Sequence, residues 1–251
     1  MSRITLQELP CPSALLPRLD HREADAEFLR CAAAADGTFY AVRAGGEAVG
    51  LAQAEPGWLY LYIFPEHRRR GYASGAVPLL ERLPRMAEEA ELSTCWNSAA
   101  GTALAASCGY RKKFSSDCMV YSGSPFPSED LPIRGYRDAD YPAAHALTAL
   151  AFHRMRLSTG SFPDSVPEAE SGEMRRHWAD TAGERLVYEL DGKLVGYAHM
   201  EGAELDCVAV EPERQGAGIG RGLVRHAVNG ILSAGHDGVF LYCVAGNRRA
   251  R

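Results

Sequence analysis

Two stretches of this sequence have residue types and spacing suited to binding a phosphate group. They cover residues 65–73 and 212–220, and each follows an apolar run and opens a segment with helical apolar spacing. Small residues at alternate positions let a ligand approach the backbone, and the first N–H groups of a helix have no partner within it. Flanking arginines, joined by Gln215 in the second copy, favour a diphosphate. Both stretches therefore predict an anion site for a nucleotide-like cofactor.

The glycine spacing excludes two common phosphate-binding loops. The P-loop requires Lys followed by Ser or Thr after its last glycine, and no such pair follows Gly220. The dinucleotide pattern G-x-G-x-x-G fails because Arg221 or Leu223 occupies the place of its third glycine, depending on where the count begins. A nucleotide-binding oxidoreductase is therefore disfavoured.

The pattern that fits is Gln or Arg, two variable residues, Gly, one variable residue, and Gly or Ala. It is satisfied by Gln215, Gly218 and Gly220, and again by Arg68, Gly71 and Ala73. This pattern resembles the coenzyme A pyrophosphate loop of the GNAT acetyltransferase superfamily. The resemblance implies acetyl-CoA as co-substrate and an α+β (mixed α/β) fold. It implies two tandem GNAT-like domains, each a mostly antiparallel, centrally splayed sheet flanked by helices.

The resemblance also implies which residues of the second copy bind the cofactor. The strand before the loop would pair with the pantetheine arm, and the loop would hold the pyrophosphate. The implied residues are Val208, Ala209, Val210, Gln215, Gly216, Ala217, Gly218, Ile219, Gly220, Arg221 and Asn247.

Transfer of an acetyl group to an amine requires an unprotonated amine, a stabilised carbonyl oxygen and a proton for the leaving thiolate. Strand alternation predicts that Glu204 shares a face with Asp206, Val208 and Val210, just before the loop. GNAT members that use a strand carboxylate as base place it similarly, so the resemblance implies Glu204 as general base and Asp206 as second choice. The alternative is that Glu204 is only a solvated residue at a turn exit. His199 and Tyr197, on the neighbouring strand, could face the acceptor, but a structural role is favoured for each.

The two loops belong to a longer internal repeat. Aligning Gln215 with Arg68 gives an offset of 147 residues, the difference between the two positions, and it places Pro212 over Pro65. A predicted hairpin turn at residues 191–196 falls over residues 45–50 at an offset of 146. The sequence is therefore interpreted as a tandem duplication.

The Pro- and Ser-rich stretch 122–132 is the predicted linker. It separates a degenerate GNAT-like domain over residues 1–121 from a GNAT-like domain over residues 133–251, which is expected to carry catalysis. At the same offset Glu204 falls over Gly57 and Asp206 over Leu59, so the first copy has no strand carboxylate there.

Hydrophobic periodicity and turn signals predict the same order of elements in each half. In the first half we expect helices at 14–35, from the loop to about 90, and at 99–107, with strands at 38–44, 47–54, 58–64, 92–96 and 112–121. In the second we expect helices at 143–154, 167–181 and from the loop to 235, with strands near 133 and at 185–189, 194–200, 204–210 and 239–244.

The last strand, residues 239–244, is followed by only seven residues, and Asn247 begins the family's next signature. We therefore expect the second domain to lack its last helix and strand, with truncation favoured over cover by another surface. An uncovered sheet edge invites association, so a homo-oligomer through residues 239–244 is a possible consequence.

Composition excludes several other classes. A net charge of −5 disfavours a nucleic-acid surface, and no window approaches the apolar length of a membrane span. Seven cysteines without C-x-x-C pairs argue against a metal site or a disulfide framework. Because the sequence also has no apolar stretch long enough for a membrane span, we expect a soluble cytoplasmic protein.

Two functions stay open. One is an acetyl-CoA-dependent N-acetyltransferase in which a small-molecule or peptide amine attacks directly. The other is a non-catalytic acyl-CoA-binding or interaction module that keeps the fold. For the acceptor we expect a place between residues 152–164 and the splayed strands beside Glu204.

Overall fold

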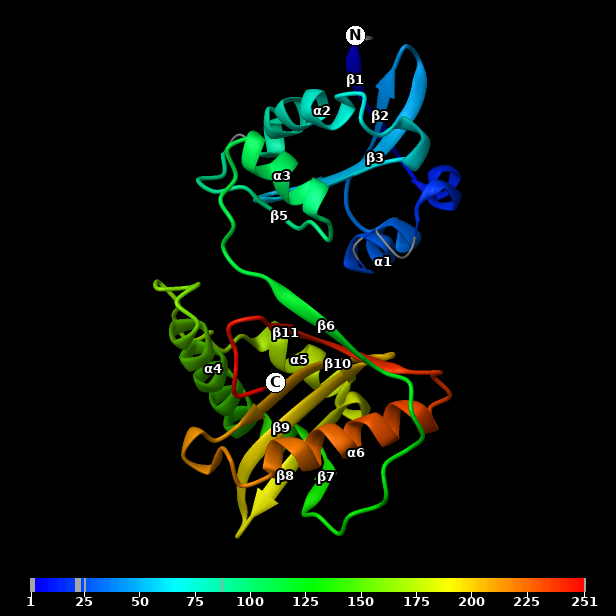
Figure 1. Cartoon of the computed structure of the whole chain (residues 1–251). Helices are drawn as coiled ribbons and strands as arrows, with labels where there is room; N and C mark the ends of the chain where they lie inside the picture. Colours follow the sequence, from blue (N-terminus) through cyan, green and yellow to red (C-terminus); the bar gives the residue numbers. More distant parts are fainter. Residues whose placement is uncertain (1–2, 21–23, 25, 87, 251) are drawn as a thin grey trace. The chain divides into compact units, whose positions relative to one another are not determined.

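The computed structural model describes residues 3–20, 24, 26–86 and 88–250, and it forms two compact units, residues 1–112 and 113–251 (Figure 1). Each unit is built around a sheet of its own. The division falls before the strand at residues 116–121, whereas the sequence placed that strand in the first domain. Within the described part of the chain, no helix is both long and apolar enough to cross a membrane.

The first unit is a five-stranded sheet in the order β1-β2-β3-β4-β5, with only β4 and β5 parallel. Strand β2 is buried on both faces, because Tyr40 and Val42 pack in the cluster under α2 while Phe39 packs in the cluster that contains α1. The elements are β1 (Ile4–Leu9), α1 (Ala26–Ala34), β2 (Phe39–Ala44), β3 (Glu47–Glu55), β4 (Trp58–Ile63), α2 (Tyr72–Glu81), β5 (Ser93–Thr94) and α3 (Ala99–Ser107).

The second unit is a six-stranded sheet in the order β6-β11-β10-β9-β8-β7, with only β10 and β11 parallel. One apolar cluster lies under α6 and another under α4 and α5. The elements are β6 (Ser116–Tyr121), β7 (Ile133–Gly135), α4 (Tyr141–Ser158), α5 (Gly172–Asp180), β8 (Arg185–Leu190), β9 (Lys193–Glu201), β10 (Glu204–Val210), α6 (Ile219–Ser233) and β11 (Val239–Val244). The expected pair of mostly antiparallel sheets flanked by helices is confirmed.

Two predicted helices of the first half were too long. The described residues of the stretch 14–35 include the 3-10 segment Ser13–Arg18 and α1, with Leu19 extended after the first of these, while residues 21–23 and 25 lie outside the described part of the chain. Helix α2 contains Pro78 but ends at Glu81, and Pro84 begins a separate 3-10 turn. Proline lacks the backbone N–H that a continuing helix needs, so the apolar pattern overstated the length of α2.

The hairpin turns of the two units have the same backbone conformation. Gly45 and Gly46 have φ of 59° and 88°, and Asp191 and Gly192, at the aligned positions, have φ of 51° and 73°. Two successive residues with positive φ match the twist of the strands that they connect, which is why Gly and Asp are favoured there. The predicted internal repeat is thus present in the backbone.

Strand β10 contains one residue more than the strand that it pairs with. His199 lies opposite Cys207, but Glu201 lies opposite Glu204, so a β-bulge separates the two pairs. The corresponding ladder between β3 and β4 is regular. The bulge therefore explains why the repeat offset changes from 146 at the hairpin to 147 at the loop.

Strand β6 overturns the expectation of an exposed sheet edge. It pairs antiparallel with β11 along the full strand, from Ser116 opposite Val244 to Tyr121 opposite Val239. The backbone N–H and C=O groups of β11 on that side therefore have partners. The proposed reason for association through residues 239–244 is removed.

The stretch 122–132 packs against the second unit instead of forming a free linker. The Phe126 N–H donates to Asn229 Oδ1 at 2.7 Å, and Asn229 Nδ2 donates to the Phe126 carbonyl at 3.0 Å. The Phe126 ring stacks on Tyr121, and Arg225 of α6 forms an ion pair with Glu129. Side chains on α6 thus fix the path of this segment, which composition alone cannot reveal.

An ion-pair network fixes the start of α4. Arg134 of β7 donates to both carboxylate oxygens of Asp140, at 2.7 and 2.8 Å, and also bonds Glu189 of β8. Asp140 also accepts the Arg137 N–H at 2.8 Å. The hydrogen bond from Arg134 lowers the pKa of the Asp140 carboxyl. Helix α4 is therefore held to the sheet at its first turn.

We predict that Asp140→Asn destabilises the protein at pH 7 by about 1–3 kcal/mol, because the variant loses charge-assisted hydrogen bonds. A carboxyl whose folded pKa is lowered stabilises the fold above its unfolded pKa, near 3.8, and this contribution disappears as pH falls through the folded pKa. Urea unfolding measured from pH 7 to pH 2 should show the two proteins converging at acid pH. Asp237→Asn, at an exposed position, is the control, and a difference that persists unchanged at low pH would contradict the prediction.

We also predict that Asn229→Ala lowers the free energy of unfolding by about 1–3 kcal/mol, because it leaves the Phe126 N–H and C=O without partners. Residues 122–132 should also become sensitive to limited proteolysis. His226→Ala, an exposed change on the same helix, should leave both unchanged. Equal proteolysis of wild type and Asn229→Ala would show that the stretch is not held by this contact.

Candidate active site

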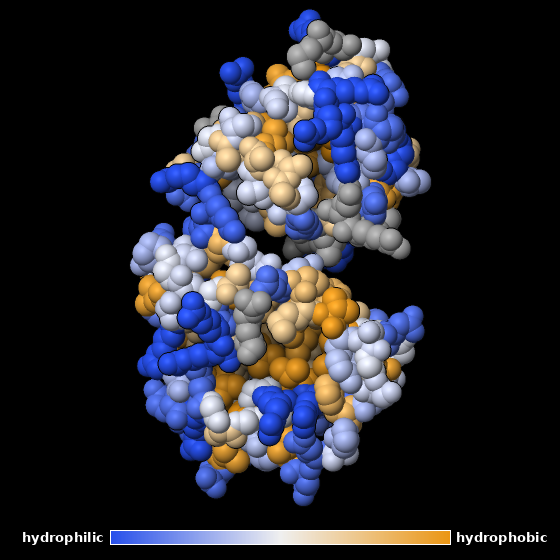
Figure 2. Space-filling model, viewed as in Figure 1, coloured by the Kyte–Doolittle hydropathy of each residue, from blue (hydrophilic) through white to orange (hydrophobic). Residues whose placement is uncertain are grey.

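Strands β10 and β11 diverge beside the predicted cofactor loop. Among the described residues they share one pair, Glu204 with Phe240, and the Phe240 N–H donates to the Ala203 carbonyl at 3.1 Å. Strand β10 nevertheless stays paired with β9 as far as Val210. Backbone groups of β10 that face away from β9 are therefore available to an extended ligand. Figure 2 shows that apolar side chains gather in a hollow on this face of the second unit.

The loop after β10 presents the N-terminus of α6. Gly218 is the N-cap residue, with φ of 88°, and no side chain caps the helix there. Gly216 has φ of 86°, and a Cβ at that position would meet no atom within 4 Å. Open space, left-handed backbone and first-turn N–H groups form an anion cradle at the positive end of a 15-residue helix.

A hydrogen bond from the first motif residue joins each loop to its strand. Gln215 Nε2 donates to the Val210 carbonyl at 3.3 Å, and Arg68 Nε donates to the Ile63 carbonyl at 3.1 Å in the first unit. The first glycine of the pattern is a left-handed helix N-cap in both units. The structural role of the motif is therefore the same in both copies.

Other predicted cofactor residues lie on β10, in α6 and after β11. Ala209 is buried in the cluster under α4, and Arg221 is exposed in the first turn of α6. Asn247 follows β11, and its N–H donates to the Val244 carbonyl at 2.8 Å. The loop and both diverging strands are thus contributed by the second unit.

The bulge changes which β10 side chains share a face. Val208 and Val210 pack in the cluster under α6, whereas Asp206 and Cys207 line a cavity on the α4 side. The expected single face for Glu204, Asp206 and the two valines was therefore wrong. An extra residue reverses the alternation at this point, since side chains alternate with a period of two.

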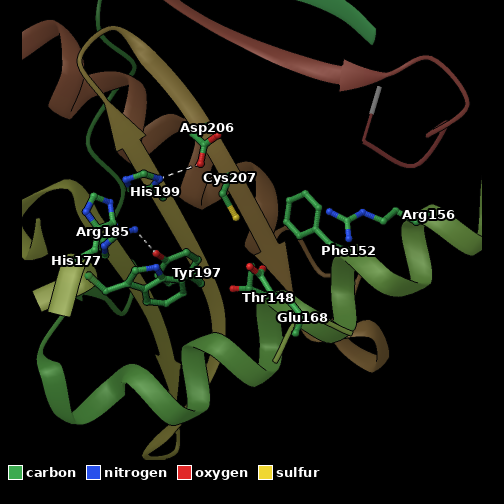
Figure 3. A pocket seen from close by; sticks show the side chains of 12 residues that line it. Thr148, Phe152, Arg156, Glu168, His177, Arg185, Tyr197, His199, Asp206 and Cys207 are labelled. Atoms are coloured by element: carbon green, nitrogen blue, oxygen red, sulfur yellow. Dashed lines mark hydrogen bonds and ion pairs between the residues drawn. The ribbon is translucent and has the colours of Figure 1, made fainter. Parts of the chain in front are cut away.

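The cavity measures about 300 Å³ and lies between the sheet and helices α4 and α5 (Figure 3). Phe152 and Arg156 line it, and a neighbouring hollow of about 530 Å³ shares both residues. The full lining comprises Thr148, Ala149, Phe152, Arg156, Glu168, His177, Trp178, Arg185, Tyr197, His199, Asp206 and Cys207.

Asp206 supplies a carboxylate to this cavity. Its Oδ2 lies 2.9 Å from His199 Nδ1, and the Asp206 side chain is 51% exposed while that of His199 is 12% exposed. His199 Nε2 lies 3.8 Å from a carboxylate oxygen of Glu184. The imidazole thus orients Asp206 from inside the protein. Glu204, the first-choice base, lies at the start of β10, outside the described residues that line the cavity.

Two other cavity side chains are held neutral by burial. Burial raises the pKa of the Cys207 thiol and the pKa of the Tyr197 phenol far above their ordinary values, although Arg185 opposes the shift in both. A neutral thiol is a poor nucleophile. The half-exposed Asp206 carboxylate is therefore better placed than Cys207 to accept a proton from an amine.

The first unit fills the equivalent space with apolar side chains. At the hairpin offset of 146, Arg185 aligns with Phe39 and Tyr197 with Leu51, and both first-unit residues are buried in the α1 cluster. Sequence reasoning missed Arg185. An arginine replacing a core phenylalanine at an aligned strand position was the signal that could have found it.

Comparison with known proteins agrees with the two-unit architecture. The profile described as the acetyltransferase (GNAT) family matches residues 4–110 and 152–251. A structure of a GCN5-related N-acetyltransferase from Sphaerobacter thermophilus has a TM-score of 0.71 and 20% identity, covering 98% of this chain and 88% of that chain, which shows the shared fold.

Two curated relatives are mycothiol acetyltransferases. The protein of Clavibacter sepedonicus is 32% identical over 119 residues, which is 45% of this chain and 36% of that protein. The protein of Saccharomonospora viridis is 27% identical over 228 residues, which is 82% of this chain and 70% of that protein. With a family match over most of its length and one GNAT-like sheet in each unit, the chain belongs to the GNAT family of acetyltransferases.

Proposed function

We propose that this protein is an acetyl-CoA-dependent N-acetyltransferase whose second unit transfers an acetyl group directly to a small-molecule or peptide amine. The observation that carries the proposal is the bulge in β10, which directs Asp206 into a cavity beside the diverging strands. A carboxylate, a cavity for the acceptor and an open strand edge ending at an anion cradle are the parts that acyl transfer from a thioester requires.

Residues of the second unit would hold the two ends of acetyl-CoA. First-turn N–H groups of α6, together with Gly216 and Gly218, hold the pyrophosphate of acetyl-CoA. Backbone groups of Val208 to Val210 pair with the extended pantetheine arm, as a strand edge pairs with a peptide. These contacts hold the thioester where β10 and β11 separate, next to the cavity that Asp206 lines.

Asp206 would act as the general base. It accepts a proton from the ammonium or amine of the acceptor, so the nitrogen lone pair can attack the thioester carbonyl. The C–N bond forms, the C–S bond breaks, and coenzyme A leaves as a thiolate that takes up the proton released by the amine. His199 holds the carboxylate in place through the 2.9 Å contact at Nδ1, which makes it a positioning residue. Asp206 is therefore proposed as the general base in place of Glu204, because Asp206 lines the cavity.

We propose that the first unit supports the fold without catalysing transfer. Its β4 ladder has no bulge, and Trp58 occupies the position opposite Glu55 that Glu204 has opposite Glu201. Phe39 and Leu51 fill the space that would receive an acceptor. The cavity that Asp206 lines belongs to the second unit, whose loop has glycine at both small-residue positions of the motif, Gly218 and Gly220.

We predict that Asp206→Asn lowers kcat/KM for acetyl transfer about 100- to 10,000-fold, since a positioned general base contributes that much. Glu204→Gln should stay close to wild type. Both variants should bind acetyl-CoA normally in calorimetry, which separates loss of chemistry from loss of the cofactor site. The converse result, a large loss only in Glu204→Gln, would return the role of base to Glu204.

We predict that Gly218→Leu weakens acetyl-CoA binding at least tenfold, because a leucine at φ near 88° is strained and its side chain enters the anion cradle. Gly71→Leu makes the same change at the aligned N-cap of α2 and should leave the Kd unchanged, with one site per chain in calorimetry. Equal losses in both variants would place a cofactor site in the first unit. Binding without turnover of any amine would favour a non-catalytic acyl-CoA-binding module.

A further inference from the structure

Arg185 is a buried cation in the wall of the candidate acceptor cavity. The residue is 2% exposed, and its guanidinium lies 4.8 Å from the centre of the Trp178 ring. Nη1 donates to the Tyr197 hydroxyl at 2.7 Å, and Nη2 donates to Thr181 Oγ1 at 2.8 Å. Both partners are neutral, and no carboxylate lies within ion-pair distance of Arg185 among the described residues. A buried charge without a counter-ion is costly.

The remaining donors of Arg185 have the geometry that a carboxylate needs. A guanidinium carries five N–H donors, and the contacts to Tyr197 and Thr181 use two of them. Nε is buried and has no hydrogen-bond partner within the described part of the chain. Nε–H and a neighbouring Nη–H point in the same direction and bind both oxygens of a carboxylate. The side chain is thus fixed by neutral groups and still has N–H donors that no described residue uses.

The first unit shows that the fold does not require a cation here. Phe39, which aligns with Arg185, is 1% exposed and packs against Phe28 at a ring distance of 6.3 Å. An apolar side chain therefore satisfies the same strand position. Replacement of a core phenylalanine by a buried, incompletely bonded arginine points to binding of an anion.

The position of Arg185 indicates which ligand carries that anion. Strand β8, which holds Arg185, is separated from β10 by β9, while the pyrophosphate cradle follows β10 at the start of α6. In Figure 3, Arg185 and His177 lie together on one side of the cavity, and Asp206 lies on another part of the wall. An anion at Arg185 would therefore belong to the acceptor.

We propose that the acceptor amine also carries a carboxylate, which Arg185 binds, so that the acceptor is of the amino-acid class. This inference rests on the proposed function. The carboxylate supplies the missing counter-ion, and the amine of the same molecule is directed toward Asp206. His177, which also lines the cavity, lies beside Arg185 (Figure 3).

The first part of the test measures binding without any transfer. In a Trp58→Phe, Trp96→Phe background, Trp178 is the remaining tryptophan of three and lies against Arg185. The twenty common L-amino acids and their carboxamides are titrated, and fluorescence of Trp178 is recorded. We expect at least one amino acid to bind about 100-fold more tightly than its amide, and Arg185→Met to abolish the difference.

The second part measures kcat/KM for the same pairs with acetyl-CoA. Arg185→Met should remove the preference for the carboxylate while acetyl-CoA binding at the α6 loop stays normal, which also shows that the variant is folded. Arg185→Lys should keep part of the preference, because it retains charge but not the paired donors. Arg176→Met, which removes an exposed charge from α5 outside the cavity lining, is the matched control.

Each unfavourable outcome has a distinct meaning. Equal transfer to acids and amides would overturn the carboxylate proposal and leave the acetyltransferase proposal standing. No transfer to any amine, with preserved binding of an amino acid that depends on Arg185, would overturn the proposed function alone. Loss of the preference in Arg156→Met instead of Arg185→Met, or no binding by any member of the panel, would overturn the assignment to Arg185.

Discussion

The candidate site depends on a single inserted residue in β10. Without the bulge, side chains of this strand would alternate regularly between the helices that cover its two faces. With it, Val208 and Val210 stay in the core under α6, while Asp206 and Cys207 face the cavity on the other side of the sheet. The bulge therefore lets one strand contribute side chains both to the core and to the candidate site. His199 Nδ1 on β9 lies 2.9 Å from Asp206 Oδ2 and holds this carboxylate in place.

The two units share a backbone but differ in the side chains at the loop and at the candidate site. Both have the same positive-φ hairpin, the same left-handed N-cap glycine and the same hydrogen bond from loop to strand. In the first unit Arg69 adopts φ of 62° where the second has Gly216, and Phe39 fills the core where the second has Arg185. Both units thus share the backbone conformation of the loop, while the candidate acceptor cavity depends on a few side chains of the second unit.

Burial explains why the cavity has a mixed electrostatic character. Arg185 and Tyr197 are nearly inaccessible, and each provides the other's hydrogen-bond partner at 2.7 Å. Low dielectric surroundings strengthen interactions of the guanidinium with any anion that enters and penalise its unpaired state. Asp206, by contrast, is half exposed. A cation buried in the wall and a carboxylate open to the cavity suit a ligand that carries both charges.

The sequence alone determined the repeat, the order of strands and helices, and the two loops, because glycine spacing and apolar periodicity act within short segments. It predicted β10 and β11 to the residue. It misassigned β6, the packed stretch 122–132 and the shared face of Asp206 with Val208 and Val210, because each depends on contacts between distant residues: Ser116 with Val244, Phe126 with Asn229, His199 with Cys207. Only the tertiary structure decided the register of β10 against β9, and a shift of one residue reverses which side chains reach the cavity.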